Sequence, residues 1–140
     1  MPTAIFDHEK LKAYQQALRF VAWVDPLLAR LPGKLAVKDQ LDRASTSVVL
    51  NLAEGNGKRS GLDRCRFFDI SRGSAVECAA CLDVFPVKKL LRAAESAEGK
   101  ASLIEIVPMT AGLITRFSTP THEEQAEYAM NTGVEEKDKE

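Results

Sequence analysis

The sequence of 140 residues has few of the residues on which disulfide frameworks and metal centres depend. It contains three cysteines (Cys65, Cys78 and Cys81) and two histidines (His8 and His122). A small, odd number of cysteines excludes a disulfide-rich scaffold and indicates a cytoplasmic protein. Cys78 and Cys81 form a single C-x-x-C, with no second pair and no histidine close by. We therefore expect two buried cysteines that act as small hydrophobic side chains, with no metal site and no cofactor.

Long apolar runs and a surplus of one charge are also missing. No apolar run approaches the ~18–20 residues that a membrane span requires, and residues 1–5 have no basic leader or apolar stretch of a secretory signal. The formal net charge is −1, with 28% charged and 45% hydrophobic residues. These values are typical of a soluble globular chain, and the length fits one domain with its own core.

The charge is unevenly distributed along the chain. Residues 118–140 carry seven acidic residues and two lysines, a charge of −5, whereas residues 1–117 carry 17 basic and 13 acidic residues, a charge of +4. We therefore expect a mildly basic domain over residues 1–117 and a polar acidic tail over residues 118–140, partly disordered. An acidic tail can screen a basic surface, so a chain that ends at Phe117 should bind anions more tightly.

Apolar residues recur at steps of three or four, the spacing of one face of a helix, in four segments: residues 8–31, 34–54, 61–85 and 103–117. Ser60 to Asp63 is typical of a capping box at the start of the third helix. Pro86 either kinks this helix, which then continues to about Ala94, or ends it. Residues 95–100 are interpreted as a polar turn that contains glycine. No segment alternates apolar and polar residues, so we predict an all-α, antiparallel up-down-up-down four-helix bundle.

The same spacing predicts which side chains face the core. In the first segment the apolar face comprises Leu11, Tyr14, Leu18, Val21, Val24, Leu28 and Leu31. In the third segment the inner face comprises Phe67, Ile70, Ser74, Cys78, Cys81 and Phe85. Leu41, Val48 and Leu52 provide the corresponding face of the second segment.

A polar seam is predicted where the second and third helices meet. Its residues follow each other at helical spacing and are Arg43, Ser47, Asn51 and Glu54, then Arg66, Gly73, Ser74 and Glu77. If the two helices form a hairpin about the loop at residues 55–60, the residue numbers of any two facing positions have a constant sum, which is 120 for Glu54 with Arg66. This register predicts ion pairs Glu54–Arg66 and Arg43–Glu77, with small residues opposite one another between them. We favour a structural role for the seam over acid–base catalysis, because it has no nucleophile–base pair; no catalytic residue is assigned.

A basic segment follows the second helix. Its five basic residues are Lys58, Arg59, Arg64, Arg66 and Arg72. A basic turn that leads into a helix N-terminus can bind a phosphate or another anion, although an ordinary solvated face has the same composition. A nucleic-acid interface would place aromatic residues among the basic ones. We expect Phe67 and Phe68, the aromatic residues nearby, to lie in the core.

Several stretches resemble the four-helix bundle family whose founders are encoded in intervening sequences of bacterial 23S ribosomal RNA genes. They are Phe6–Leu11, Gln40–Ser47, Asn51–Ser60 and Gly73–Glu77. The resemblance covers residues 5–117 and implies a bundle that often assembles into a ring-like pentamer. It also implies a relationship to the accessory protein of diversity-generating retroelements, a relative of this family. That protein binds reverse transcriptase and RNA through a basic surface. Asp42 stands where relatives often have a second basic residue, which argues against RNA binding here.

Three functions follow from these observations. We expect a non-enzymatic, homo-oligomeric bundle that acts as an interaction scaffold, with the pentamer implied by the resemblance and no contact with a membrane. The alternative is binding of structured RNA, or of an enzyme that acts on nucleic acid, through the basic face of residues 58–72. A small enzyme that uses the polar seam is the third interpretation.

Overall fold

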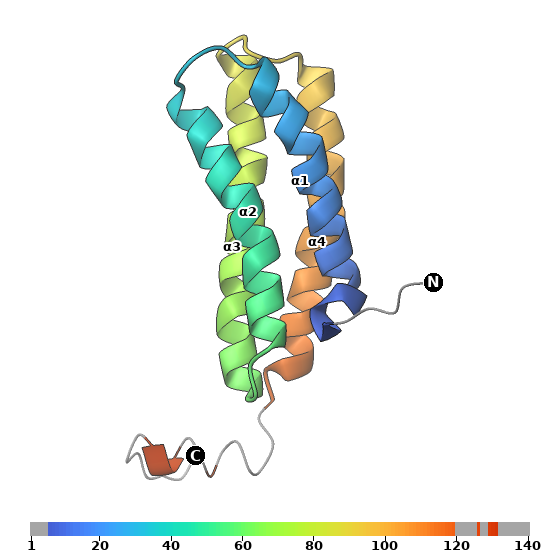
Figure 1. Cartoon of the computed structure of the whole chain (residues 1–140), viewed down its shortest axis with the longest axis vertical. Coiled ribbons are helices and arrows are strands. Elements are labelled where there is room, and N and C mark those ends of the chain that lie inside the picture. The colour runs from blue at the N-terminus through green and yellow to red at the C-terminus, as the bar shows by residue number, and fades with distance from the viewer. Residues whose placement is uncertain (1–5, 120–125, 127–128, 132–140) are drawn as a thin grey trace, which may run out of the picture.

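The computed structural model describes residues 6–119, 126 and 129–131. A short 3-10 helix, η1 (Asp7–Lys10), precedes four α-helices: α1 (Lys12–Arg30), α2 (Ala36–Asn56), α3 (Gly61–Val87) and α4 (Ala93–Phe117). Each long helix packs against the next one along the chain, and α1 also packs against α4 (Figure 1). The predicted all-α, up-down four-helix bundle is confirmed.

The core is formed by side chains from all four helices. Phe20, Phe68 and Phe85 are the largest fully buried residues, and Leu52 and Ile106 lie with them. Burial of each such side chain contributes about 1.5–3 kcal/mol to stability. The core therefore extends along the whole bundle and depends on the apolar face of every helix.

Two helix ends follow the sequence signals. The backbone N–H of Asp63 donates a hydrogen bond of 3.0 Å to Ser60 Oγ, so Ser60 caps α3 as expected. At the other end, α3 ends at Val87, one residue after Pro86. Of the two outcomes predicted for this proline, the early stop is correct, and Lys89 then adopts a left-handed conformation with φ of 60°. The loop of residues 57–60, which Ser60 ends, lies at the lower end of the bundle (Figure 1).

Other boundaries differ from the prediction. The first helical segment is not continuous after Asp7, because Leu11 has an extended backbone that separates η1 from α1. The predicted turn at residues 95–100 is wrong, since α4 begins at Ala93. Gly99 is buried inside this helix, where a Cβ atom would lie 2.5 Å from the Trp23 ring. Glycine is needed at this position for close packing and does not mark a turn.

The predicted inner faces of α1 and α3 are partly wrong. Leu18 is 45% exposed and Ile70 is 51% exposed, although both belong to the predicted faces. The buried positions include small residues instead, namely Ala13, Ala17, Ser71 and Ala75. Alanine and serine carry a weak hydrophobic signal, so the core face is rotated from the stripe of large apolar residues.

The acidic tail expected over residues 118–140 lies for the most part outside the described residues. Phe117, the last residue of α4, lies at the same end of the bundle as the loop of residues 57–60 (Figure 1). Among the helices that the structure describes, none has both the length and the hydropathy to cross a bilayer.

Candidate interaction surfaces

Hydrogen bonds between α2 and α3 fix the register of this helix pair. The hydroxyl oxygens of Ser47 and Ser74 lie 2.8 Å apart. Ser71 Oγ, which is buried, donates a hydrogen bond of 2.8 Å to the carbonyl oxygen of Val48. The residue numbers of these pairs total 121 and 119, so the predicted hairpin register is confirmed.

The ion pairs predicted from this register do not form. The side chains of Arg43, Glu54 and Glu77 are exposed and make no hydrogen bond or ion pair with another described residue. Arg66 Nη1 instead lies 3.5 Å from Asp63 Oδ1 in an exposed contact within α3. The prediction is wrong because the correct register does not fix the direction of the side chains. All four charged groups of the seam lie on the outer side of the helix pair.

The small residues of the seam have separate roles. Gly73 is exposed, and a Cβ atom built there would meet nothing within 4 Å. The close approach between α2 and α3 occurs instead at Gly55, outside the seam, where a Cβ atom would lie 2.9 Å from Phe68 Cε1. Asn51 Nδ2 donates hydrogen bonds to the Ser47 carbonyl oxygen and hydroxyl at 2.9 Å and 3.0 Å. Within the seam, the polar contact between the two helices is therefore limited to the half-buried Ser47, Asn51 and Ser74.

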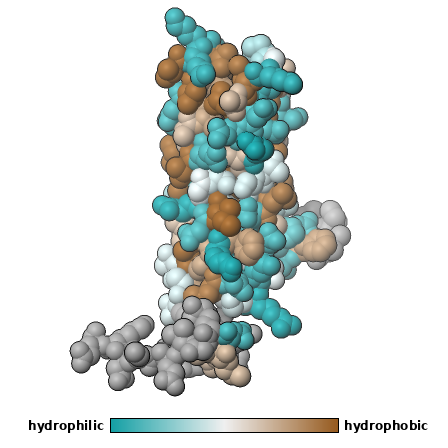
Figure 2. Space-filling model, turned by 90° about the vertical axis from the view of Figure 1, so that its left-hand side faces the viewer, coloured by the Kyte–Doolittle hydropathy of each residue, from teal (hydrophilic) through white to brown (hydrophobic). Residues whose placement is uncertain are grey.

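Two large apolar side chains lie on the same outer side. Leu50 of α2 is 59% exposed and Ile70 of α3 is 51% exposed. We call this surface the α2/α3 outer face; it comprises Arg43, Ser47, Leu50 and Glu54 of α2, with Arg66, Ile70, Gly73 and Glu77 of α3. Figure 2 looks at this side of the bundle and shows a small hydrophobic area among hydrophilic atoms, next to a band of intermediate hydropathy. A shallow groove runs along α2 beside Leu50 and Asn51.

A second candidate surface lies at the lower end of the bundle. Lys58 Nζ lies 4.8 Å from the centre of the Phe67 ring, and Arg64 Cζ lies 4.7 Å from the centre of the Phe117 ring. Arg116 Cζ lies 5.1 Å from the Phe117 ring. Both rings are half-buried, so the expectation that Phe67 lies in the core is only partly correct. We call Lys58, Arg59, Arg64 and Arg116 the basic end.

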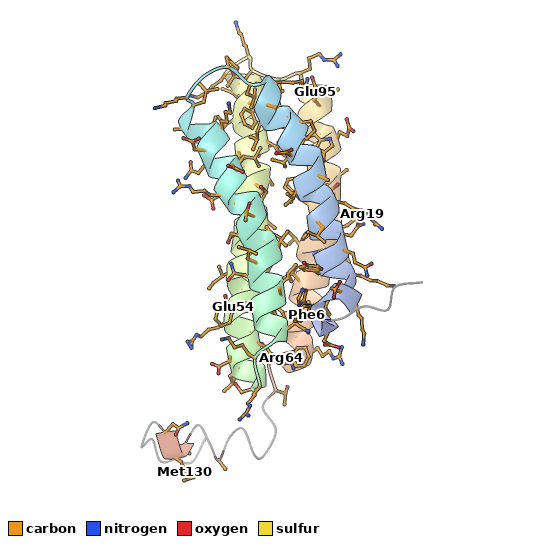
Figure 3. All side chains as sticks on the ribbon, in the orientation of Figure 1. Phe6, Arg19, Glu54, Arg64, Glu95 and Met130 are labelled. Atoms are coloured by element: carbon orange, nitrogen blue, oxygen red, sulfur yellow. The ribbon has the colours of Figure 1, made fainter. Side chains whose placement is uncertain are left out.

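The five basic residues of segment 58–72 do not share one face. Arg64 Nε donates a hydrogen bond of 2.9 Å to the Lys58 carbonyl oxygen, which joins these two residues at the basic end. Arg66 belongs to the α2/α3 outer face. Arg72 lies six residues further along α3 and is therefore rotated from Arg66 by about 120°. Figure 3 labels Arg64 and Glu54 and shows both near the lower end of the bundle.

The two cysteines of the C-x-x-C are part of the core. Cys78 is fully buried and Cys81 is 5% exposed, and both are free thiols. Burial raises the pKa of the Cys78 thiol to about 12 and also raises the pKa of Cys81. A thiol of this pKa is a poor nucleophile and a poor metal ligand at neutral pH. The expectation of buried cysteines that act as small hydrophobic side chains is confirmed.

Comparison with known proteins assigns the family. The family model described as "23S rRNA-intervening sequence protein" matches residues 9–112. The chain belongs to this family. The fold of this chain is similar to that of a protein of unknown function from the S23 ribosomal protein family of Bacteroides thetaiotaomicron, which is known from a crystal structure. That structure is 17% identical, covers 73% of this chain and 97% of its own, and has a TM-score of 0.69. No curated protein matches the chain.

The motifs that resemble the 23S rRNA-intervening sequence proteins have two roles in this structure. Gly55 and Ser74 pack α2 against α3, whereas Glu54 and Glu77 are exposed. Sequence reasoning missed Leu50 as a surface residue, although it lies off the stripe of Leu41, Val48 and Leu52. It also missed the contact between Arg64 and Phe117, which brings Arg116 to the basic end, because that contact joins segments far apart in the sequence.

Proposed function

We propose that this chain is a non-enzymatic helical-bundle module that assembles with further copies of itself and acts as an interaction scaffold. The observation that carries the proposal is the exposed apolar pair Leu50 and Ile70 on the α2/α3 outer face. Apolar side chains on a rigid helix surface, bordered by charged residues, are typical of protein–protein interfaces. The resemblance to the family adds the expectation of a ring-like pentamer.

Replacement of this apolar pair tests the proposal. Leu50→Ser with Ile70→Ser removes exposed apolar surface and leaves the core intact, so the helical circular dichroism should not change. Self-association measured by sedimentation velocity should weaken by about 10- to 100-fold. Val87→Ser, at a position that is 81% exposed at the end of α3, is the matched control and should have no effect. An unchanged mass distribution in the double variant would contradict the proposal for this face.

Binding of structured RNA is the second candidate function, and the arrangement of the basic end favours it. Lys58 and Arg64 lie over half-buried aromatic rings. Single-stranded segments and loops of RNA are bound by basic side chains interleaved with aromatic rings. This arrangement supports RNA binding at the end of the bundle more than along the whole segment 58–72.

Affinity for a structured RNA, measured by fluorescence anisotropy, tests this candidate. It should fall steeply as salt increases, since binding releases condensed counterions. Arg59→Glu with Arg64→Glu should abolish binding, whereas Lys88→Glu with Lys89→Glu, at the opposite end of the bundle, should leave it largely unchanged. Equal affinity of the two double variants would remove this candidate.

The C-terminal tail gives a further test of the RNA candidate. Its seven acidic residues follow α4, which ends at the basic end. A chain that ends at Phe117 should therefore bind the RNA more tightly than the full chain, with the larger difference at low salt. Equal affinity of the two chains would mean that the tail does not screen this surface.

A further inference from the structure

Two loops lie at the upper end of the bundle, opposite the loop of residues 57–60 (Figure 1). One joins α1 to α2, and the other joins α3 to α4. Between them lies a pocket of about 420 Å³, a volume within the range of sites that hold small molecules. Leu31 and Pro32 of the first loop line it, together with Leu90 and Leu91 of the second. We call this cavity the upper pocket.

The charged residues of the upper pocket are mainly basic. Arg30, Lys89 and Arg92 line it together with one acidic residue, Glu95, so three positive side chains and one carboxylate give a charge of +2. Figure 3 labels Glu95 at this end of the bundle. The pocket therefore combines apolar walls with an excess of positive charge. This combination is complementary to a small molecule that has an apolar body and an anionic group.

One carboxylate positions both arginines beside the pocket. Arg30 Nη2, at the end of α1, lies 2.8 Å from Glu95 Oε2, and Arg92 Nε, at the N-cap of α4, lies 3.6 Å from Glu95 Oε1. A guanidinium group has several N–H donors, and each of these contacts uses only one nitrogen. Both arginines therefore keep N–H donors for a further anion. The planar array of guanidinium donors matches the oxygen atoms of a phosphate group.

Lys89 occupies a backbone position that usually belongs to glycine. Helix α3 ends in a Schellman motif, in which the N–H of Leu90 donates to the Phe85 carbonyl oxygen at 2.9 Å and the N–H of Lys89 donates to the Pro86 carbonyl oxygen at 3.0 Å. This motif needs a left-handed residue directly after the cap, and Lys89 has a φ of 60°. Glycine adopts this conformation freely, whereas a residue with a Cβ atom loses folding free energy there. Backbone strain of this kind is typical of functional sites.

We propose that the upper pocket binds a small phosphate monoester. Arg30, Lys89 and Arg92 bind the phosphate group, and the organic part lies against the apolar residues of the two loops. A phosphate monoester carries about two negative charges at neutral pH, which matches the charge of the lining. Lysine replaces glycine at position 89 because its ammonium group binds the anion. The inference is independent of both proposed functions, which depend on the α2/α3 outer face and on the basic end.

Three probes separate the two features of the ligand. Phenyl phosphate has both, inorganic phosphate lacks the apolar body, and phenol lacks the phosphate. In an NMR titration of the isotopically labelled full chain, phenyl phosphate should shift the backbone amide signals of residues 89–92. It should bind about 10-fold more tightly than inorganic phosphate, and phenol should cause no such shifts at the same concentration. Shifts confined to the basic end, or equal affinity for phenyl phosphate and either of the other probes, would overturn the proposal.

Lys89→Gly should change binding and stability in opposite directions. The variant loses the ammonium group, so its affinity for phenyl phosphate should fall by at least about 10-fold. It also relieves the backbone strain, so the equilibrium constant for unfolding in urea should fall by about 2- to 5-fold. Lys88→Gln is the matched control, because it removes one positive charge from the neighbouring residue, which lies outside the pocket lining. It should change the affinity by no more than about 2-fold.

Two results with Lys89→Gly would contradict the assignment. One is an affinity equal to that of the unaltered chain, because the ammonium group would then not contact the ligand. The other is a loss of stability, because lysine would then be retained for packing. A short single-stranded RNA that shifts the signals of residues 89–92 at a lower concentration than phenyl phosphate would overturn the small-molecule ligand in favour of nucleic acid.

Discussion

The hydroxyl oxygens of Ser47 and Ser74 lie 2.8 Å apart in the half-buried centre of the α2/α3 contact. This pair joins positions 27 residues apart in the sequence. Together with the hydrogen bond from Ser71 Oγ to the Val48 carbonyl oxygen, it fixes how α2 is aligned with α3. The alignment in turn places Leu50 opposite Ile70 and determines the charge pattern of the α2/α3 outer face.

A double-mutant cycle measures this alignment. Ser47→Ala and Ser74→Ala should each lower the free energy of unfolding by about 0.5–1.5 kcal/mol, since each leaves a hydroxyl group without its partner. The double variant should lose less than the sum of the two. Urea unfolding at a fixed protein concentration provides the values. In the control cycle, Thr46→Ala with Ser74→Ala should be additive, because Thr46 Oγ1 donates its hydrogen bond to the Asp42 carbonyl oxygen within its own helix. Additivity in the Ser47 cycle would contradict the contact.

Gly99 and Gly112 give opposite expectations for the same substitution in the same helix. In Gly99→Ala the new methyl group would lie 2.5 Å from the Trp23 ring and 2.9 Å from Leu82 Cδ1. It should destabilise the bundle by about 1–3 kcal/mol, as overpacking does. In Gly112→Ala the methyl group meets nothing within 4 Å, so the gain in helix propensity should stabilise α4 by up to about 1 kcal/mol. Thermal unfolding of both variants distinguishes these effects. Equal changes of the same sign would contradict the packing of Gly99.

The contact between Arg30 and Glu95 joins α1 to the first turn of α4 and should depend on pH. A hydrogen bond of 2.8 Å from Arg30 Nη2 holds the pKa of the Glu95 carboxyl below its ordinary value of 4.5. Because the folded pKa is lowered, the contribution of this contact is present above the ordinary pKa and is lost as the pH falls through the lowered value. Arg30→Gln should raise the pKa of Glu95, as measured by NMR titration. Arg19→Gln is the control and should leave it unchanged; equal titration curves in both variants would contradict the contact.

The C-x-x-C should be unreactive in the folded chain. With a pKa of about 12, Cys78 is ionised in about one molecule in ten thousand near pH 8. In a Cys65→Ser variant, which removes the partly exposed thiol, alkylation of the native protein should be slower by orders of magnitude than alkylation in denaturant. Mass spectrometry follows both reactions. Rapid labelling of the native chain, or a Cys78–Cys81 disulfide after mild oxidation, would contradict the burial of these two thiols in the core.

The helices and their register could be predicted from the sequence because they depend on local signals. Ser60 provides a cap that is recognisable from four consecutive residues. The register follows from the short loop that joins the two antiparallel helices. The residue numbers of the Ser47–Ser74 pair total 121, within one position of the predicted 120. The core was harder to predict, because Ala17 and Ala75 occupy buried positions that a search for large apolar residues does not find.

The candidate surfaces depend on features that spacing does not specify. The register is correct for Glu54 and Arg66, but whether two facing charges point toward one another depends on side-chain direction, and these groups lie on the outer side. The contact of Arg64 with Phe117 joins residues of different helices and requires the tertiary structure. Gly99 lies in a stretch whose composition is typical of a turn, but its position belongs to the core. The contact with the Trp23 ring, which the sequence does not show, distinguishes the two.

The mass of the unaltered chain in solution tests the proposed self-assembly most directly. Sedimentation equilibrium at micromolar concentration should give a multiple of the chain mass of 15.4 kDa, and this mass should fall toward one chain on dilution. A mass of a single chain throughout the micromolar range would contradict the assembly of this protein through the α2/α3 outer face.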